Sequence, residues 1–145
     1  MDSPEPEEAR PRRLVLVADD EDDVREMVQA VLSSAGFESL SARDGQEALE
    51  VIQRRSGRVD LVLTDVMMPG FDGPTLARRL AHEWPEIPVL FMTGYMSEAL
   101  AARGLLPAEV PRIEKPFRIS FLIGKVRAAL GLPPLDRPPR SPAGE

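Results

Sequence analysis

The fold of this chain is decided by residues 61–73, Leu61-Val-Leu-Thr-Asp65-Val-Met-Met-Pro69-Gly70-Phe-Asp-Gly73, where a short apolar run ends at a single acid. An apolar run of this length, bounded by turn-forming residues, is typical of a strand that is buried on both faces. Pro69 and Gly70 then turn the chain away from the strand. Asp65 is therefore predicted at the carboxyl end of a central strand, which is the edge where open parallel sheets bind ligands.

The composition predicts one globular domain between two tails. The 145 residues are 43% hydrophobic and 29% charged, which is close to ordinary globular usage and enough to bury a core. Residues 1–11 and 133–145 are rich in proline and have few side chains to bury. We therefore expect two disordered tails around a folded unit of residues 12–132.

The balance of residue types excludes several classes of function. Eighteen basic and 24 acidic residues give a net charge of −6, which disfavours direct binding to nucleic-acid phosphates. The chain has no cysteine, and so no disulfide, thiolate metal site or thiol nucleophile. It has neither a run of roughly 20 apolar residues nor a signal-peptide pattern. We expect a soluble, cytoplasmic protein without membrane contact.

Strand and helix patterns alternate along the folded unit. Apolar runs predict strands at residues 14–18, 37–42, 61–65, 87–92 and 111–114. Helical spacing and capping residues predict helices that include residues 24–32, 44–54, 72–80, a short stretch from Ser97, and 120–130. With right-handed crossovers this order gives a parallel sheet covered by helices on both faces. The second and fifth strands are polar enough to be edges, which favours a flavodoxin-like doubly wound sheet of order 2-1-3-4-5 with five helices over a barrel.

In this strand order the acids that follow the first and third strands are neighbours. Asp19, Asp20 and Asp65 should therefore meet at one edge of the sheet, where at least one pKa must rise unless a cation compensates the repulsion. Mg²⁺ accepts such oxygen ligands and would leave one carboxylate able to attack phosphorus. Thr93 and Lys115 follow the fourth and fifth strands, so they should reach the same edge and suit phosphoryl oxygens.

Four motifs in this order resemble the receiver domain of two-component response regulators. They are the Asp19-Asp20 pair, Thr-Asp65-Val-Met-Met-Pro-Gly-Phe-Asp-Gly, Met-Thr93-Gly-Tyr and Glu-Lys115-Pro-Phe. The resemblance covers about residues 12–132 and is closest to receivers of hybrid sensor kinases or single-domain receivers, through the Met-Thr-Gly-Tyr motif. The family shares the flavodoxin-like strand order, so that order and the resemblance are not independent predictions.

The resemblance implies a phosphoryl acceptor and a metal site. Asp65 would accept a phosphoryl group from a histidine kinase or a histidine phosphotransfer protein. Asp20, Asp65 and the backbone carbonyl of Met67 would bind Mg²⁺, and Asp19 would assist through water.

The resemblance also implies switch residues, with one departure from the usual pattern. Thr93 would bond the phosphoryl group and move on activation, Lys115 would pair with that group, and the Lys115–Pro116 peptide is expected to be cis. Many members carry an aromatic residue three positions before the lysine, where this chain has Arg112. Tyr95 is expected to take over that part of the switch.

The implied function is a phosphorylation-dependent signalling switch and not an enzyme, with at most self-phosphorylation from small donors and slow autodephosphorylation. The signal would pass to an unidentified partner protein, and we expect a phosphorylation-dependent dimer through the fourth helix, fifth strand and fifth helix. Two alternatives are weaker. A haloacid-dehalogenase-type Mg²⁺-dependent phosphohydrolase needs a second acid where this chain has Met67. A degenerate receiver that acts as a constitutive interaction module would lack a site residue, and none is missing.

Overall fold

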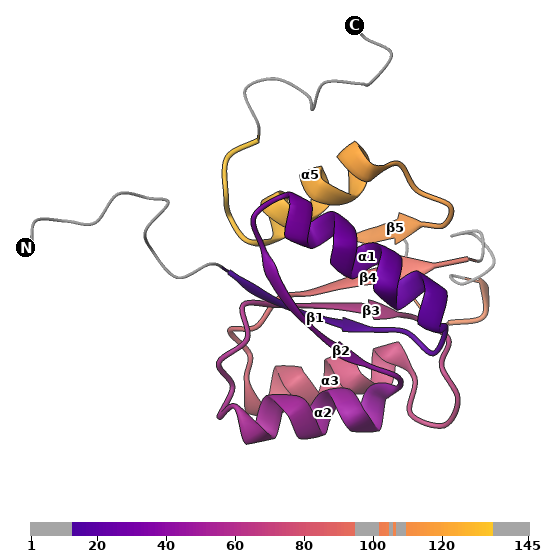
Figure 1. Cartoon of the computed structure of the whole chain (residues 1–145). Coiled ribbons are helices and arrows are strands. Elements are labelled where there is room, and N and C mark those ends of the chain that lie inside the picture. Colours follow the sequence, from indigo (N-terminus) through magenta and orange to yellow (C-terminus); the bar gives the residue numbers. More distant parts are fainter. Residues whose placement is uncertain (1–12, 95–101, 105, 107–109, 135–145) are drawn as a thin grey trace, which may run out of the picture.

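The chain is built around a five-stranded parallel sheet of order β2-β1-β3-β4-β5 (Figure 1). A computed structural model describes residues 13–94, 102–104, 106 and 110–134. The strands are β1 (Leu14–Ala18), β2 (Glu38–Ala42), β3 (Leu61–Asp65), β4 (Val89–Thr93) and β5 (Arg112–Glu114). The helices in the described part are α1 (Asp22–Ser34), α2 (Gly45–Arg54), α3 (Gly73–Glu83) and α5 (Ile119–Ala129). The predicted flavodoxin-like architecture is confirmed, while the helix expected from Ser97 lies outside the described residues.

Helices cover both faces of the sheet, α1 and α5 on one side and α2 and α3 on the other (Figure 1). Alternate residues of the central strands enter the two cores. Val15 and Val17 of β1 lie in the core with α1 and α5, whereas Leu16 lies in the core with α2 and α3. Every residue of β1 and β3 is buried, which explains why these two strands read as continuous apolar runs.

Helix α1 ends just before Gly36. Gly36 has a φ of +92°, a left-handed conformation that glycine adopts without strain. The Phe37 amide donates to the Leu32 carbonyl at 2.9 Å and the Gly36 amide to the Ser33 carbonyl at 3.1 Å. These two bonds form a Schellman motif that leads directly into β2.

The predicted amino-terminal caps of α2 and α3 are confirmed. Asp44 Oδ1 accepts from the Glu47 amide at 2.8 Å, and Asp72 Oδ1 accepts from the Thr75 amide at 2.9 Å. The second hydrogen bond of the capping box at α2 differs from the usual pattern. Glu47 Oε1 accepts from the Arg43 amide at 2.7 Å and not from the Asp44 amide. Both caps direct their helices away from the carboxyl edge of the sheet, where the acids lie.

The fourth strand begins two residues later than its apolar run. The sequence predicts a strand from residue 87, but β4 begins at Val89. Pro88 has no amide hydrogen to donate, so it contributes only its carbonyl, which accepts from the Val62 amide at 3.0 Å. The regular ladder therefore starts with the pair Val62 and Val89.

Candidate functional site

Acidic side chains from two neighbouring strands meet at the carboxyl edge of the sheet. Ala18 is paired with Thr64, so the residues that follow them, Asp19 and Asp65, lie beside each other. Asp20 joins them, and carboxylate oxygens of Asp19, Asp20 and Asp65 all lie within 4.8 Å of one another. The structure thus brings together the three acids that the strand order placed at this edge.

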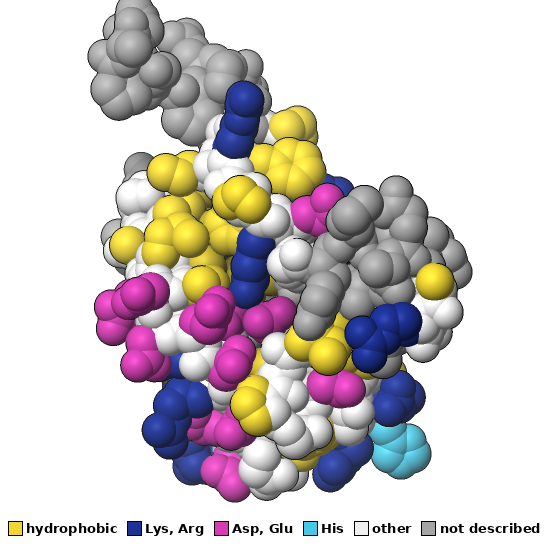
Figure 2. All heavy atoms as spheres, turned by 90° about the vertical axis from the view of Figure 1, so that its right-hand side faces the viewer, with side chains coloured by type: hydrophobic (Ala, Val, Ile, Leu, Met, Phe, Trp, Pro, Cys, Tyr) yellow, Lys and Arg dark blue, Asp and Glu magenta, His cyan; other side chains and the backbone are white. Residues whose placement is uncertain are grey.

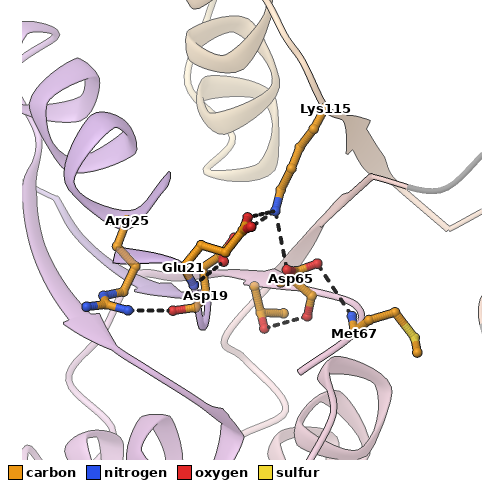
Figure 3. Close-up of polar contacts among 7 residues, drawn as sticks. Asp19, Glu21, Arg25, Asp65, Met67 and Lys115 are labelled. Carbon is orange, nitrogen blue, oxygen red and sulfur yellow. Dashed lines mark hydrogen bonds and ion pairs between the residues drawn. The ribbon is translucent and has the colours of Figure 1, made fainter. Parts of the chain in front are cut away.

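Lys115 completes the cluster from the other side (Figure 3). Its Nζ lies 2.8 Å from Asp19 Oδ2 and 3.3 Å from Asp65 Oδ2, with Glu21 Oε1 at 3.9 Å. The Lys115 amide donates to the Thr93 carbonyl at 2.7 Å, which ties the lysine backbone to the end of β4. The Lys115–Pro116 peptide is cis, as the resemblance implied.

The pKa values of Asp65 and Lys115 are both higher than those of exposed side chains of the same type. Burial, together with the charge of Asp19, raises the pKa of Asp65 from 3.8 to about 6, although Lys115 acts in the opposite direction. Burial alone would lower the pKa of Lys115, but its hydrogen bond to Asp19 and the negative charges of Asp65 and Asp19 raise it overall. The expectation that one carboxyl pKa rises is therefore borne out, and Lys115 stays charged.

The turn after β1 is held by residues that the sequence analysis missed. The Glu21 amide donates to Asp19 Oδ1 at 2.9 Å, and Arg25 Nη1 donates to the Asp19 carbonyl at 2.8 Å (Figure 3). Arg25 also forms an ion pair with Asp22, whose i,i+3 spacing was visible in the sequence. The contact with Asp19 had no such signal, because it depends on how α1 leaves the strand.

The loop after β3 lies close to the reactive edge. The Met67 amide donates to Asp65 Oδ1 at 3.4 Å, and the Met67 side chain is 36% exposed. A Cβ atom at Gly73 would lie 2.3 Å from the Asp65 carbonyl oxygen, so the start of α3 packs against the Asp65 backbone without room for a side chain. The sequence indicated Gly73 only as a helix-start residue, and its contact with Asp65 was missed.

Two of the three expected switch residues, Thr93 and Arg112, lie in the described part of the chain. Thr93 is fully buried at the end of β4, and its Cα partner in β5 is Glu114. Arg112 is half-buried in β5, where its Nε donates to the Val110 carbonyl at 3.1 Å. Tyr95 lies outside the described residues.

The acidic cluster fits a hard divalent cation. Its donors are carboxylate oxygens close enough for one ion to contact several of them, and Asp20 is exposed, which leaves the ion open to water. Mg²⁺ usually combines one or two carboxylates with several waters. The pKa of Asp65 is raised mainly by burial and in part by the charge of Asp19, and a bound cation would stabilise the ionised carboxylate against both effects.

In the part of the chain that the structure describes, no helix combines the length and apolar character that crossing a membrane requires.

Comparisons with known proteins agree with this geometry. A family model for the response regulator receiver domain matches residues 15–127. The chain is 39% identical over 116 residues to the sensor kinase CckA of Brucella abortus, which covers 80% of this chain and 12% of CckA. It is 31% identical over 116 residues to the response regulator receiver protein CpdR of the same organism, covering 80% of this chain and 95% of CpdR. The solved structure of the chemotaxis protein CheY4 of Vibrio cholerae superposes with a TM-score of 0.71 at 30% identity, covering 83% of this chain and all of that one.

The relatives differ in how much of their length this chain represents. It spans 12% of CckA and about half of several other response regulators that match, against 95% of CpdR.

Proposed function

This chain belongs to the response regulator receiver domain family, and we propose that it is a phosphorylation-dependent signalling switch whose phosphoryl acceptor is Asp65. The observation that carries the proposal is the position of the Asp65 carboxylate, which is largely buried between two further acids and 3.3 Å from the Lys115 ammonium. A nucleophile, a cation and a site for a metal ion are therefore within reach of one transferred group. We take residues 12–132 as the receiver domain.

The proposed donor is a histidine kinase or a histidine phosphotransfer protein. A carboxylate oxygen of Asp65 attacks the phosphorus of a phosphohistidine, and the phosphorus–nitrogen bond breaks. The electron pair of that bond stays on the imidazole nitrogen, and the product is an aspartyl phosphate. Because the pKa of Asp65 is about 6, most of this carboxyl is ionised at neutral pH and can act as the nucleophile.

The other site residues have separate roles in the proposal. Asp19, Asp20, Asp65 and the Met67 carbonyl would hold Mg²⁺, which supplies positive charge for the carboxylates and for the phosphoryl oxygens. Lys115 would pair with a phosphoryl oxygen as a second positive charge. The Thr93 hydroxyl would donate to another oxygen, and its rearrangement with Tyr95 and Arg112 would report the phosphorylated state. We expect no substrate turnover beyond self-phosphorylation and slow autodephosphorylation, since Met67 occupies the position where a phosphohydrolase of the haloacid-dehalogenase type needs its acid.

An apolar surface lies directly beside the acids (Figure 2). A groove between α1 and the segment after β5 is lined by Val24, Met27, Pro116, Phe117 and by Lys115 itself. Lys115 lines both the groove and the site, so a protein that delivers a phosphoryl group to Asp65 approaches this groove closely. We propose that the phosphodonor protein rests on this groove.

The output is proposed to leave through a different surface. Ile119 and Phe121 are 56% and 51% exposed at the start of α5, the helix that follows β5 along the chain. We propose that phosphorylation changes the affinity of this region for an unidentified downstream protein or for a second copy through the fourth helix, β5 and α5. Histidine kinases phosphorylate receivers in the cytoplasm, and we place the chain there.

Phosphorylation by a small donor tests the acceptor assignment. Wild-type protein incubated with acetyl phosphate and Mg²⁺ should gain one phosphoryl group in an intact-mass measurement, and Asp65→Asn should gain none. Asp23→Asn serves as the matched control, since Asp23 is an exposed acid of α1, and it should label like wild type. Equal labelling of Asp65→Asn would contradict the proposal, and sustained release of phosphate from many substrate molecules would favour the hydrolase.

A further inference from the structure

We propose that Arg25 is a positioning residue for the metal site: its guanidinium fixes the turn that presents Asp19 and Asp20, and so sets the affinity for Mg²⁺. The inference rests on the proposed function, in which these acids hold the ion. Arg25 itself touches neither the reacting atoms nor the ion.

The Arg25 side chain bridges the turn and the helix that follows it (Figure 3). Its Nη1 donates to the Asp19 carbonyl at 2.8 Å, and its Nη2 pairs with the carboxylate of Asp22. Only 12% of the side chain is exposed. A guanidinium that donates from two nitrogens in a plane has little freedom, so both acceptors are held in a defined relation.

The location of Arg25 is unfavourable for the helix alone. It lies in the first turns of α1, where the helix dipole favours negative charge and disfavours a cation. A largely buried arginine also loses hydration that its partners must replace. Within the helix, Arg25 gains only the i,i+3 ion pair with Asp22. Its hydrogen bond to the Asp19 carbonyl lies outside the helix, so helix stability does not explain that contact.

The carbonyl that Arg25 binds belongs to the peptide group between Asp19 and Asp20. The Asp19 side chain has independent anchors, because Lys115 and the Glu21 amide both bind its carboxylate. Within the described part of the chain the Asp20 carboxylate has no hydrogen-bond partner, and it is exposed. The direction of Asp20 therefore depends on the backbone of this turn, and Arg25 holds that backbone from the helix side.

The two effects of Arg25 on a bound cation have opposite signs. As a positive charge near the site, it repels Mg²⁺, so a purely electrostatic role predicts tighter binding when the charge is removed. As a positioning residue, it keeps the ligand oxygens in place, and its removal should weaken binding by about tenfold, the usual effect of losing a residue that orients metal ligands. The sign of the change in Kd thus separates positioning from electrostatics.

Titration of the full chain with MgCl2 by calorimetry provides the test. Arg25→Met should raise the Kd for Mg²⁺ by about tenfold relative to wild type. Arg43→Met is the matched control, since Arg43 also follows a strand at this edge but is 73% exposed and pairs with Glu47. The control removes the same charge and should leave the Kd within about twofold of wild type. Amide NMR shifts of Asp20 and Glu21 in the absence of Mg²⁺ should move in Arg25→Met and stay in Arg43→Met.

Two outcomes would overturn the inference. Arg25→Met that binds Mg²⁺ as tightly as wild type, or more tightly, shows that the arginine does not position the ligands. If the wild-type protein fails to bind Mg²⁺, the acids do not form a metal site, and the proposed function on which the inference rests is also contradicted. If circular dichroism shows that Arg25→Met is unfolded, Arg25→Lys replaces it. This variant keeps the charge but not the two-nitrogen geometry, so a Kd about threefold above wild type supports positioning and an equal Kd contradicts it.

Discussion

Asp65 is an acid that the protein keeps in an unfavourable environment. Its side chain is largely buried, and its pKa of about 6 lies above the 3.8 of an ordinary aspartate. The folded state therefore binds the Asp65 proton more tightly than the unfolded state does. It follows that the stability contributed by Asp65 is present when the carboxyl is protonated and is lost as pH rises from about 4 to about 6.

Replacement of Asp65 by asparagine should stabilise the protein at pH 7 in the presence of a chelator. The raised pKa already includes the attraction of Lys115, so it sets the upper limit of the gain at roughly 3 kcal/mol. The advantage over wild type should shrink as pH falls towards 4, where wild-type Asp65 is protonated. Urea unfolding at both pH values measures it, with Asp23→Asn as the control for general charge. A variant less stable than wild type at pH 7 would show that the Lys115 pair outweighs burial.

Residue types at strand ends were enough to predict the central members of the site. Asp19, Asp65 and Lys115 each follow or end a predicted strand, so the strand order alone placed them together. Arg25 and Gly73 were missed for a physical reason. Their roles depend on how closely a helix approaches a neighbouring backbone, and no spacing in the sequence measures that distance.

At the scale of elements, the junction between β3 and α3 is the tightest contact of the site. The Gly73 amide donates to the Val66 carbonyl at 3.0 Å, and an added Cβ would overlap the Asp65 carbonyl oxygen. The atom that this Cβ would meet is backbone, so no side chain can rotate away to make room. The start of α3 therefore fixes the backbone on which the Asp65 carboxylate is carried.

The Gly73→Ala variant should separate α3 from the end of β3. We expect a loss of about 1–3 kcal/mol in the free energy of unfolding, as for other overpacked sites, and a weaker affinity for Mg²⁺. Gly124→Ala in α5 is the control, because its Cβ would meet no atom within 4 Å. That change should raise stability by about 0.5–1 kcal/mol through helix propensity. Thermal and urea unfolding measure both variants, and a stable Gly73→Ala would refute the proposed close contact.

Local signals predicted most element boundaries because caps and glycines act over a few residues. The caps Asp44 and Asp72 were predicted correctly because each side chain accepts a hydrogen bond from the first turn of its own helix. Local signals predicted the wrong strand boundary or hydrogen-bond partner where a neighbouring segment of the chain determines the structure. The start of β4 depends on whether Pro88 can join the ladder with β3, and Glu47 bonds the Arg43 amide because of the local path of the chain.

At the scale of the whole molecule, the sheet gathers residues that are far apart in sequence. Asp19 and Lys115 are 96 positions apart, yet their side chains are 2.8 Å apart. The two cores on either side of β1 and β3 make the strand ends a rigid frame, and the acids have little freedom to move away from each other. Charge repulsion at this edge therefore opposes folding, and a bound cation should favour folding.

Mg²⁺ should stabilise the whole domain through this edge. An ion that binds only the folded state adds about 1.4 kcal/mol when its free concentration is ten times the Kd, which corresponds to a rise in Tm of roughly 4–6 °C for a domain of this size. Asp20→Asn removes an exposed ligand while leaving the Asp19 and Asp65 contacts with Lys115, so its Mg²⁺-dependent rise should be less than half that of wild type. Thermal melts with MgCl2, with NaCl of equal ionic strength and with a chelator separate specific binding from screening. An equal rise in Asp20→Asn, or an equal rise with NaCl, would mean that Mg²⁺ acts on the general negative charge of the protein and not at the cluster of Asp19, Asp20 and Asp65.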